Sequence, residues 1–274
     1  MDSYCVYNYN ELIEKLNNIT DKNKNVELFF NNFTFNSIIN QNLAKGNSTY
    51  VFKNVIKEDT IKSKIIQYLN KLHHQNLTKI TSLIREIIFQ THDELNELVY
   101  QCIQKIKRDN DQIRPLVAAL CWELLSTYFV TSDGDKIYFR KLLLSEVKKE
   151  YLSSMDFENE NWTKDRAEKS IILIGTLFNS KIIDFKIMSS IINDLKKIIE
   201  FKDNGTQEDY EKVEKCLQLL SYLISSIVLN EDSKKLYGNI DEFLEYQMNI
   251  YEEKKCITKK IRLVCKNTIS ELRK

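Results

Sequence analysis

Few side chains in this sequence have the type and spacing that enzymatic chemistry requires. His73 and His74 stand together at the predicted end of a helix, and His92, the third and last histidine, lies within a predicted capping box. Cys121 belongs to the apolar run AALCWELL, where burial raises a thiol pKa and leaves the group unreactive. The sequence has no glycine-rich phosphate loop, GxSxG motif or HExxH motif. We therefore expect a protein that is not an enzyme and that has no metal site and no cofactor.

Charged residues give one local candidate for binding. The whole chain has a formal net charge of +1, so nothing global attracts it to nucleic acid or to an anionic membrane. Between residues 254 and 274, however, eight basic residues and the single acid Glu271 leave a net charge of +7. The lysines assigned to this basic patch are Lys254, Lys255, Lys259, Lys260 and Lys266. Such a cluster predicts contact with RNA or with an acidic partner, and the alternative is an ordinary solvated helix face.

The pattern of apolar residues predicts the elements that position these side chains. From about Thr60 onward, apolar residues recur at i, i+3, i+4 and i+7, and the chain has one proline and five glycines in 274 residues. We predict ten helices, at 61–72, 77–90, 93–108, 114–129, 136–154, 164–180, 184–201, 210–229, 240–253 and 256–273. They pair into five hairpins whose starts are spaced irregularly around the ~40–47 residues of HEAT-type repeats. The predicted fold class is all-α, an α-solenoid of about five HEAT-like hairpins preceded by an extended N-terminal segment with a short helix.

Local signals support these boundaries. Thr91 and Glu94 form a predicted capping box, and Thr206 with Asp209 forms a variant with a shorter acid. Asp133-Gly134 is a turn signal between two of the hairpins.

The remaining composition bears on the compartment. The six cysteines are scattered without a CxxC pair, which is typical of a reducing environment. The N-terminus lacks the features of a signal peptide, and no stretch reaches the roughly 18 apolar residues of a membrane span. We expect a soluble cytoplasmic or nuclear protein that makes no membrane contact.

Four stretches of the predicted solenoid resemble one family. FRKLLLSEVKKEY (139–151), IILIGTLFNSKII (171–183), VEKCLQLLSYLISS (213–226) and EEKKCITKKIRLVCKNTISELR (252–273) occur in the order found in the middle domain of eukaryotic translation initiation factor 4G. The similarity spans roughly residues 61–274. It implies a scaffold of five repeats that clasps the two lobes of the DEAD-box helicase factor 4A and accelerates its ATP and RNA cycle.

The same resemblance implies a helicase interface, transferred residue by residue. The positions are Phe178, Asn179, Lys181, Arg262 and Leu263. Leu263 replaces an aromatic residue of the family, and Asn179 stands where the family usually has lysine. The alternative for Phe178 is a core position in its own helix.

The resemblance also gives a meaning to the tyrosine-rich N-terminus. Factor 4G binds the cap-binding protein factor 4E through Tyr-x-x-x-x-Leu followed by an apolar residue, and Tyr7, Leu12 and Ile13 match this motif. Leu16 extends the apolar stripe of a short helix that would fold on binding. A second match, from Tyr138 to Leu144, lies inside a predicted core helix where its leucines are needed for packing.

These inferences divide the chain into three parts. Residues 1–19 hold the factor 4E-binding motif, and residues 60–274 form the middle domain. Residues 20–59 lack helical periodicity but contain six aromatics, which is typical either of an extension packed on the first repeat or of a segment that orders against a partner.

The resulting hypothesis is a translation-initiation scaffold that bridges a cap-binding protein and a helicase, stimulates the helicase and recruits capped mRNA. The alternative is a middle-domain adaptor in another mRNA pathway, such as nonsense-mediated decay, splicing or nuclear cap binding, or a translation inhibitor. A helical enzyme ranks third.

Overall fold

The computed structural model describes two units of the chain, Met1–Glu58 and Asp59–Lys274. The residues described are 7–8, 49–50, 60–201, 205–228 and 230–273. In the first unit, β1 (Tyr7–Asn8) pairs with β2 (Thr49–Tyr50) in an antiparallel ladder that places Tyr7 opposite Tyr50.

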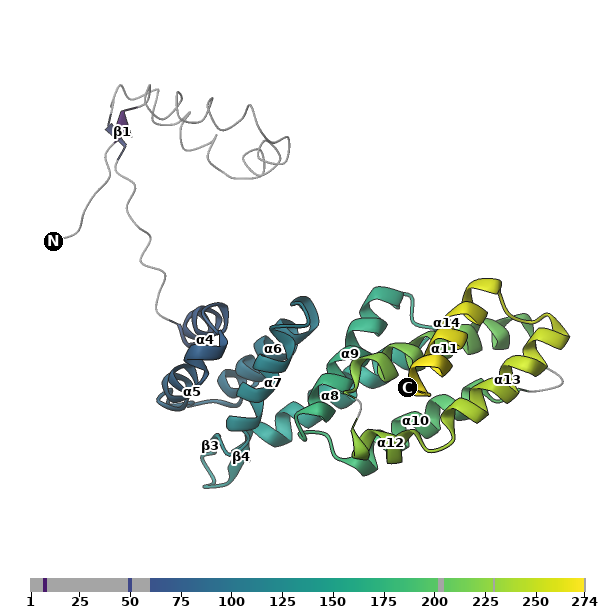
Figure 1. Ribbon diagram of the computed structural model, residues 1–274. Helices are drawn as coiled ribbons and strands as arrows, with labels where there is room; N and C mark the ends of the chain where they lie inside the picture. Colours follow the sequence, from purple (N-terminus) through teal and green to yellow (C-terminus); the bar gives the residue numbers. More distant parts are fainter. Residues whose placement is uncertain (1–6, 9–48, 51–59, 202–204, 229, 274) are drawn as a thin grey trace. The chain divides into compact units, whose positions relative to one another are not determined.

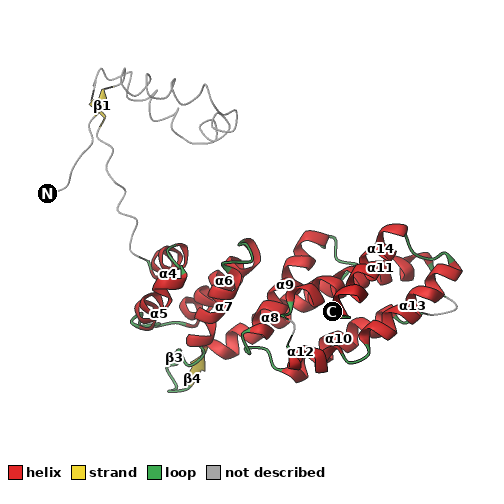
Figure 2. Ribbon diagram, viewed as in Figure 1, coloured by secondary structure: helices red, strands yellow, loops and turns green. Residues whose placement is uncertain are grey.

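The second unit is built of helices with one small β-hairpin (Figures 1 and 2). Its elements are α4 (Ile61–Asn70), the 3-10 helix η1 (His74–Asn76), α5 (Leu77–Arg85), α6 (His92–Arg108), α7 (Arg114–Glu123), β3 (Tyr128–Val130), β4 (Lys136–Tyr138), α8 (Phe139–Met155), α9 (Lys164–Asn179), α10 (Phe185–Ile199), α11 (Gln207–Ser226), α12 (Glu231–Tyr237), α13 (Ile240–Lys254) and α14 (Lys259–Leu272). Each helix turns an apolar stripe toward its neighbours, and the buried residues form one continuous core.

Three helices organise this packing. Helix α6 contacts α4, α7, α8 and α9, whereas α11 contacts α9, α10 and α14, so α9 touches both. Helix α9 therefore lies between α6 and α11 along the unit (Figure 1). This arrangement confirms the predicted all-α, solenoid-like fold.

Both predicted capping boxes are present. At the start of α6, the Thr91 hydroxyl accepts a hydrogen bond from the Glu94 N–H at 3.2 Å, and the Glu94 carboxylate accepts one from the Thr91 N–H at 3.3 Å. At the start of α11, Thr206 and Asp209 make the same reciprocal pair of bonds. These side chains satisfy N–H groups that the helices cannot pair internally.

The prediction was wrong between α7 and α8, where it extended helices to Phe129 and from Lys136. Helix α7 ends at Glu123 and α8 begins at Phe139, and β3 and β4 form an antiparallel hairpin between them. The hairpin turns at Gly134, whose φ of 84° suits glycine. The cause is local sequence, since aromatic and β-branched residues alternate on both sides of a Thr-Ser-Asp-Gly-Asp turn.

The end of α5 and the presence of α12 also differ from the prediction. Helix α5 ends at Arg85 rather than at residue 90, and Ile88 beyond it is 80% exposed. Helix α12 was not predicted, because seven residues are too few to show helical periodicity. It begins at a cap formed by Asn230 and Ser233, and its last residue, Tyr237, donates a buried hydrogen bond to the carbonyl of Ile224.

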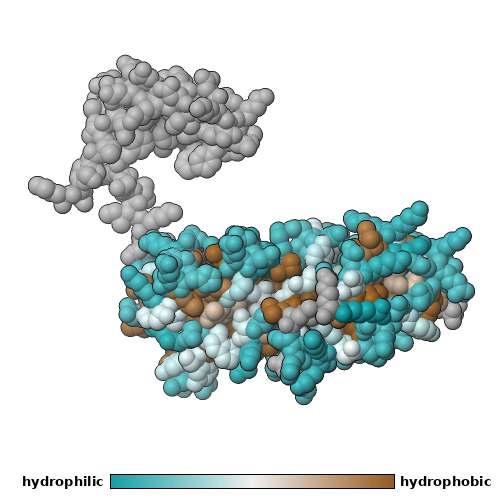
Figure 3. Space-filling model, viewed as in Figure 1, coloured by the Kyte–Doolittle hydropathy of each residue, from teal (hydrophilic) through white to brown (hydrophobic). Residues whose placement is uncertain are grey.

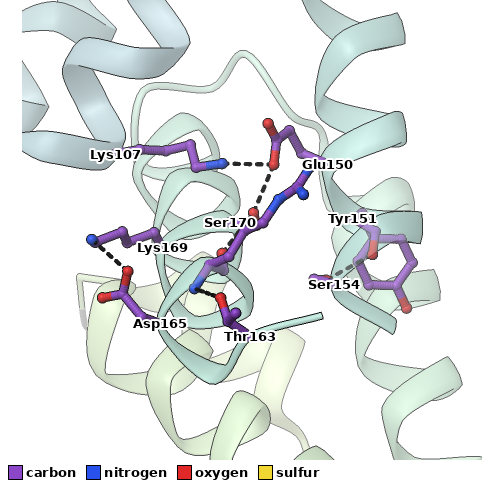
Figure 4. A network of polar contacts seen from close by, with 9 residues as sticks. Lys107, Glu150, Tyr151, Ser154, Thr163, Asp165, Lys169 and Ser170 are labelled. Carbon is purple, nitrogen blue, oxygen red and sulfur yellow. Dashed lines mark hydrogen bonds and ion pairs between the residues drawn. The ribbon is translucent and has the colours of Figure 1, made fainter. Parts of the chain in front are cut away.

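A buried polar network ties three helices together (Figure 4). The Nζ of Lys107 in α6 lies 2.7 Å from Oε2 of Glu150 in α8, and the hydroxyl of Ser170 in α9 donates to the same oxygen at 2.8 Å. Burial disfavours ionisation of Glu150, but the hydrogen bonds from Lys107 and Ser170 outweigh it and lower the pKa of the carboxyl. The network fixes the N-terminal half of α9 against α6 and α8.

Among the described residues, no helix is both long enough and apolar enough to cross a membrane.

Candidate partner-binding surfaces

The predicted helicase residues around the end of α9 lie at the molecular surface. Phe178 is partly buried and packs against the hydrophobic core, whereas Asn179 is exposed. Lys181 is also exposed, and its φ of 60° places it in the left-handed region, where the chain turns toward α10. Phe178 packs against the core and is also partly exposed, so its burial is compatible with a core role and with a contact to a partner.

Asn179 has a structural role that the sequence did not reveal. Its Nδ2 donates to the carbonyl oxygen of Ser226 at 2.8 Å, and its Oδ1 accepts from the N–H of Val228 at 3.0 Å. The terminal carbonyls of a helix have no partner within the helix, so Asn179 caps α11 from a neighbouring helix. Both hydrogen-bonding groups of its amide are therefore engaged within the chain.

The close approach of α9 to α11 depends on Gly175. A Cβ atom built at this position would lie 1.9 Å from Oγ and 2.9 Å from Cβ of Ser226. Gly175 and Asn179 are four residues apart, so they lie on the same face of α9 and meet the same end of α11.

Three exposed apolar side chains lie at the start of α10 and just after the end of α11. Phe185 and Ile187, in the first turn of α10, are 46% and 41% exposed, and Val228, directly after α11, is 62% exposed. Sequence periodicity could not find them, because it assigns apolar residues to the core and gives no sign of those at helix ends that remain outside.

The second predicted helicase contact lies alongside the middle of α11, away from its C-terminal end. Leu263 in α14 is 62% exposed, and Arg262 lies 3.6 Å from the carboxylate of Glu252 in α13. The N–H of Thr258, just before α14, donates to Glu214 of α11, and the hydroxyl of Thr268 in α14 donates to that of Ser221. Arg262 and Leu263 therefore lie level with a point between Glu214 and Ser221, about eight residues or roughly 12 Å along α11 from Ser226. The structure does not bring the two predicted contacts together.

The basic patch divides into paired and unpaired side chains. Arg273 binds Asp241 and Glu245, and Lys266 lies 3.7 Å from Glu252, so acids of α13 offset part of the predicted charge.

The other four lysines flank the turn between α13 and α14: Lys254, Lys255, Lys259 and Lys260. All four are exposed, and among the described residues none has an acidic partner within ion-pair distance. Hydrophilic residues cover much of the visible surface in this region (Figure 3). The binding candidate is therefore this four-lysine cluster.

Comparison with known proteins gives the family. Residues 63–274 match the MIF4G domain. The chain belongs to the MIF4G domain family. Among solved structures, it is similar to the MIF4G domain of Trypanosoma cruzi translation initiation factor EIF4G5, with 11% identity, a TM-score of 0.44, and coverage of 78% of this chain and 95% of that chain. No curated protein matches it.

The tyrosine motif lies ahead of the MIF4G domain. The backbone of Tyr7 is part of β1, while Leu12, Ile13 and Leu16 lie outside the described residues. The second match to the motif falls within the domain, where Leu143 is fully buried and Leu144 packs against the core. Its predicted role in packing is confirmed.

Two observations concern the candidate metal-binding and nucleophilic side chains of the MIF4G domain. Among its described residues, no group of three or more histidine, cysteine or acidic side chains is placed to hold a metal ion. A hydrogen bond with Cys102, together with burial, raises the pKa of the Cys121 thiol well above its usual value.

Proposed function

We propose that this chain is a translation-initiation scaffold without catalytic activity of its own. It bridges a cap-binding protein of the factor 4E type and a DEAD-box helicase of the factor 4A type, stimulates the helicase and recruits capped mRNA in the cytoplasm. The observation that carries this proposal is the match of residues 63–274 to the MIF4G domain. MIF4G domains occur in initiation factor 4G and related adaptors and bind helicases and other partners.

The cap-side contact rests on Tyr7, Leu12 and Ile13, with Leu16 continuing the stripe. An extended segment presents the tyrosine, and a short amphipathic helix then lays its apolar face in a groove of the partner. The position of the motif ahead of the domain supports this assignment, because the second match in the chain uses buried leucines of α8.

The helicase contact is assigned to two places. Phe178 and Lys181 lie at the C-terminal end of α9, and Arg262 and Leu263 lie near the start of α14. Their separation along α11 supports contact with two different parts of a helicase rather than with a single pocket. The four-lysine cluster adds a contact to RNA phosphates, which cationic side chains bind with strong dependence on salt.

A pull-down with a factor 4E-type protein on cap-analogue resin tests the cap-side contact. We expect the intact chain to be retained, Tyr7→Ala with Leu12→Ala to abolish retention, and the matched control Tyr9→Ala to leave it unchanged. Failure of the intact chain to bind, or equal retention of the double variant, contradicts the assignment.

Stimulation of the ATPase of a factor 4A-type helicase tests the other contact. We expect Phe178→Ala with Arg262→Glu to remove most of the stimulation, and Tyr100→Ala, at an exposed aromatic residue of α6, to leave it intact. Unchanged stimulation by the double variant would remove these residues from the interface.

A further inference from the structure

We infer that Asn179 is a positioning residue for the helicase contact and that Val228 is the side chain it presents. This inference rests on the proposed helicase-binding function, and it changes the part that Asn179 plays there. The resemblance placed Asn179 among the residues that touch the helicase. The structure assigns its amide to the end of α11 and leaves Val228, whose backbone N–H it binds, 62% exposed.

The amide of Asn179 is hydrogen-bonded within the chain through both of its polar atoms. Nδ2 donates to Ser226 and Oδ1 accepts from Val228, at 2.8 and 3.0 Å, which are ordinary lengths for such bonds. One hydrogen of Nδ2 and one lone pair of Oδ1 are thereby committed to the end of α11, and these two bonds fix the orientation of the amide. A lysine at this position could donate to the carbonyl but could not accept from the Val228 N–H.

The side chain of Val228 points into solvent. Ile227 has extended backbone angles, with φ of −96° and ψ of 128°, and its side chain is buried in the core. Successive side chains of an extended backbone point to opposite sides, so Val228 points away from the core. The bond from its N–H to Asn179 fixes the backbone from which it projects.

Several contacts hold the backbone at the end of α11 in place. Tyr237 donates a buried hydrogen bond to the carbonyl of Ile224, in the last turn of α11. Gly175 lets α9 approach closely enough for Asn179, one turn later, to reach the terminal carbonyl. An apolar side chain on a fixed backbone loses little conformational entropy on binding, which favours its use as a contact.

The resulting surface is continuous with the proposed contact at Phe178. Asn179 bonds to the backbone of Val228 and directly follows Phe178, while Phe185 and Ile187 are exposed at the adjacent start of α10. The partner that this surface fits is the helicase of the proposed function, through an apolar patch on one of its lobes.

The experiment measures binding of the intact chain to a purified factor 4A-type helicase by calorimetry, with thermal unfolding of every variant as a check on folding. We expect Val228→Glu to weaken binding about tenfold without lowering the melting temperature, since a charge at a buried contact is costly. The matched control is Val130→Glu, at a valine of β3 that is 51% exposed, and it should bind like the wild type.

A double-mutant cycle separates positioning from direct contact. We expect Asn179→Ala to weaken binding about fivefold alone, and Asn179→Ala with Val228→Ser to bind no worse than Val228→Ser, because both changes remove the same contact. Additive losses would overturn the inference, as would wild-type binding by Val228→Glu. If Val228→Glu binds like the wild type but Phe178→Ala binds weakly, the inference about Val228 is wrong and the proposed helicase-binding function still stands. If the intact chain fails to bind the helicase, the inference and the proposed function are both wrong.

Discussion

The two ends of α11 differ in how their surroundings are held. At the C-terminal end, Gly175 and Asn179 of α9 grip the backbone of Ser226 and Val228, and the exposed side chains are apolar. At the N-terminal end, the four-lysine cluster flanks the turn between α13 and α14 and reaches solvent without ion-pair partners among the described residues. The first region thus offers apolar side chains on a hydrogen-bonded backbone, and the second offers exposed positive charges whose effect depends on salt. The difference suits two kinds of partner, a protein surface and a phosphate backbone.

The largest expected effect concerns the buried network that fixes α9. Lys107→Ala removes the ammonium group that pairs with the partly buried Glu150 and leaves the carboxylate with the Ser170 hydroxyl as its hydrogen-bond donor, and we expect the free energy of unfolding to fall by about 3 kcal/mol. Chemical denaturation measures this change. The control replaces both partners, Lys107→Met with Glu150→Leu, and should lie near the wild type. A loss below about 1 kcal/mol for the single variant would show that the ion pair between Lys107 and Glu150 does not stabilise the packing of α9.

The next effect tests the close contact of α9 with α11. Gly175→Ala introduces a Cβ atom that overlaps Ser226, and we expect a loss of about 2 kcal/mol in the free energy of unfolding. Adding Ser226→Gly removes the atoms that clash and should restore most of the loss. Equal destabilisation with and without the second change would place the cost elsewhere in the fold.

The lysine end should respond in binding rather than in stability. Lys259→Glu with Lys260→Glu should weaken RNA binding about tenfold at low salt and flatten its salt dependence, because fewer counterions are released. Lys141→Glu with Lys148→Glu is the control, since both lysines are exposed on α8, away from the turn. Electrophoretic mobility shifts at several salt concentrations measure the effect, and equal losses for the two variants would contradict a localised patch.

The smallest effect is the pH dependence of the network that holds α9. The pKa of Glu150 is lower in the folded chain than its ordinary value of 4.5, so its contribution to stability is present above that value. The contribution is lost as the pH falls through the lowered pKa. Denaturation between pH 6 and pH 3 should therefore show a steeper loss for the wild type than for Glu150→Gln, and parallel curves would contradict it.

Sequence periodicity and capping signals were sufficient for most of the fold. Apolar spacing identified the helices from α4 to α14 except α12, and Thr91 and Thr206 marked two helix starts where the structure has them. The β-hairpin was missed because apolar residues of short strands were taken as continuations of helices.

The surfaces were harder to predict from the sequence. Asn179 bonds to residues about 47 positions away, and no local pattern indicates such a contact. The pairing of Arg262, Lys266 and Arg273 with acids of α13 likewise depends on tertiary packing, so a count of charges along the sequence overstated the basic patch.

The central claim is that one chain joins a cap-binding protein to a helicase, and a bridging assay tests it most directly. A factor 4E-type protein is immobilised on cap-analogue resin, and retention of a factor 4A-type helicase is measured with and without the intact chain. We predict that the helicase is retained only when the chain is present, and that Tyr7→Ala with Leu12→Ala releases the chain and the helicase together. Retention of the chain without the helicase, or of neither protein, would contradict the bridging role.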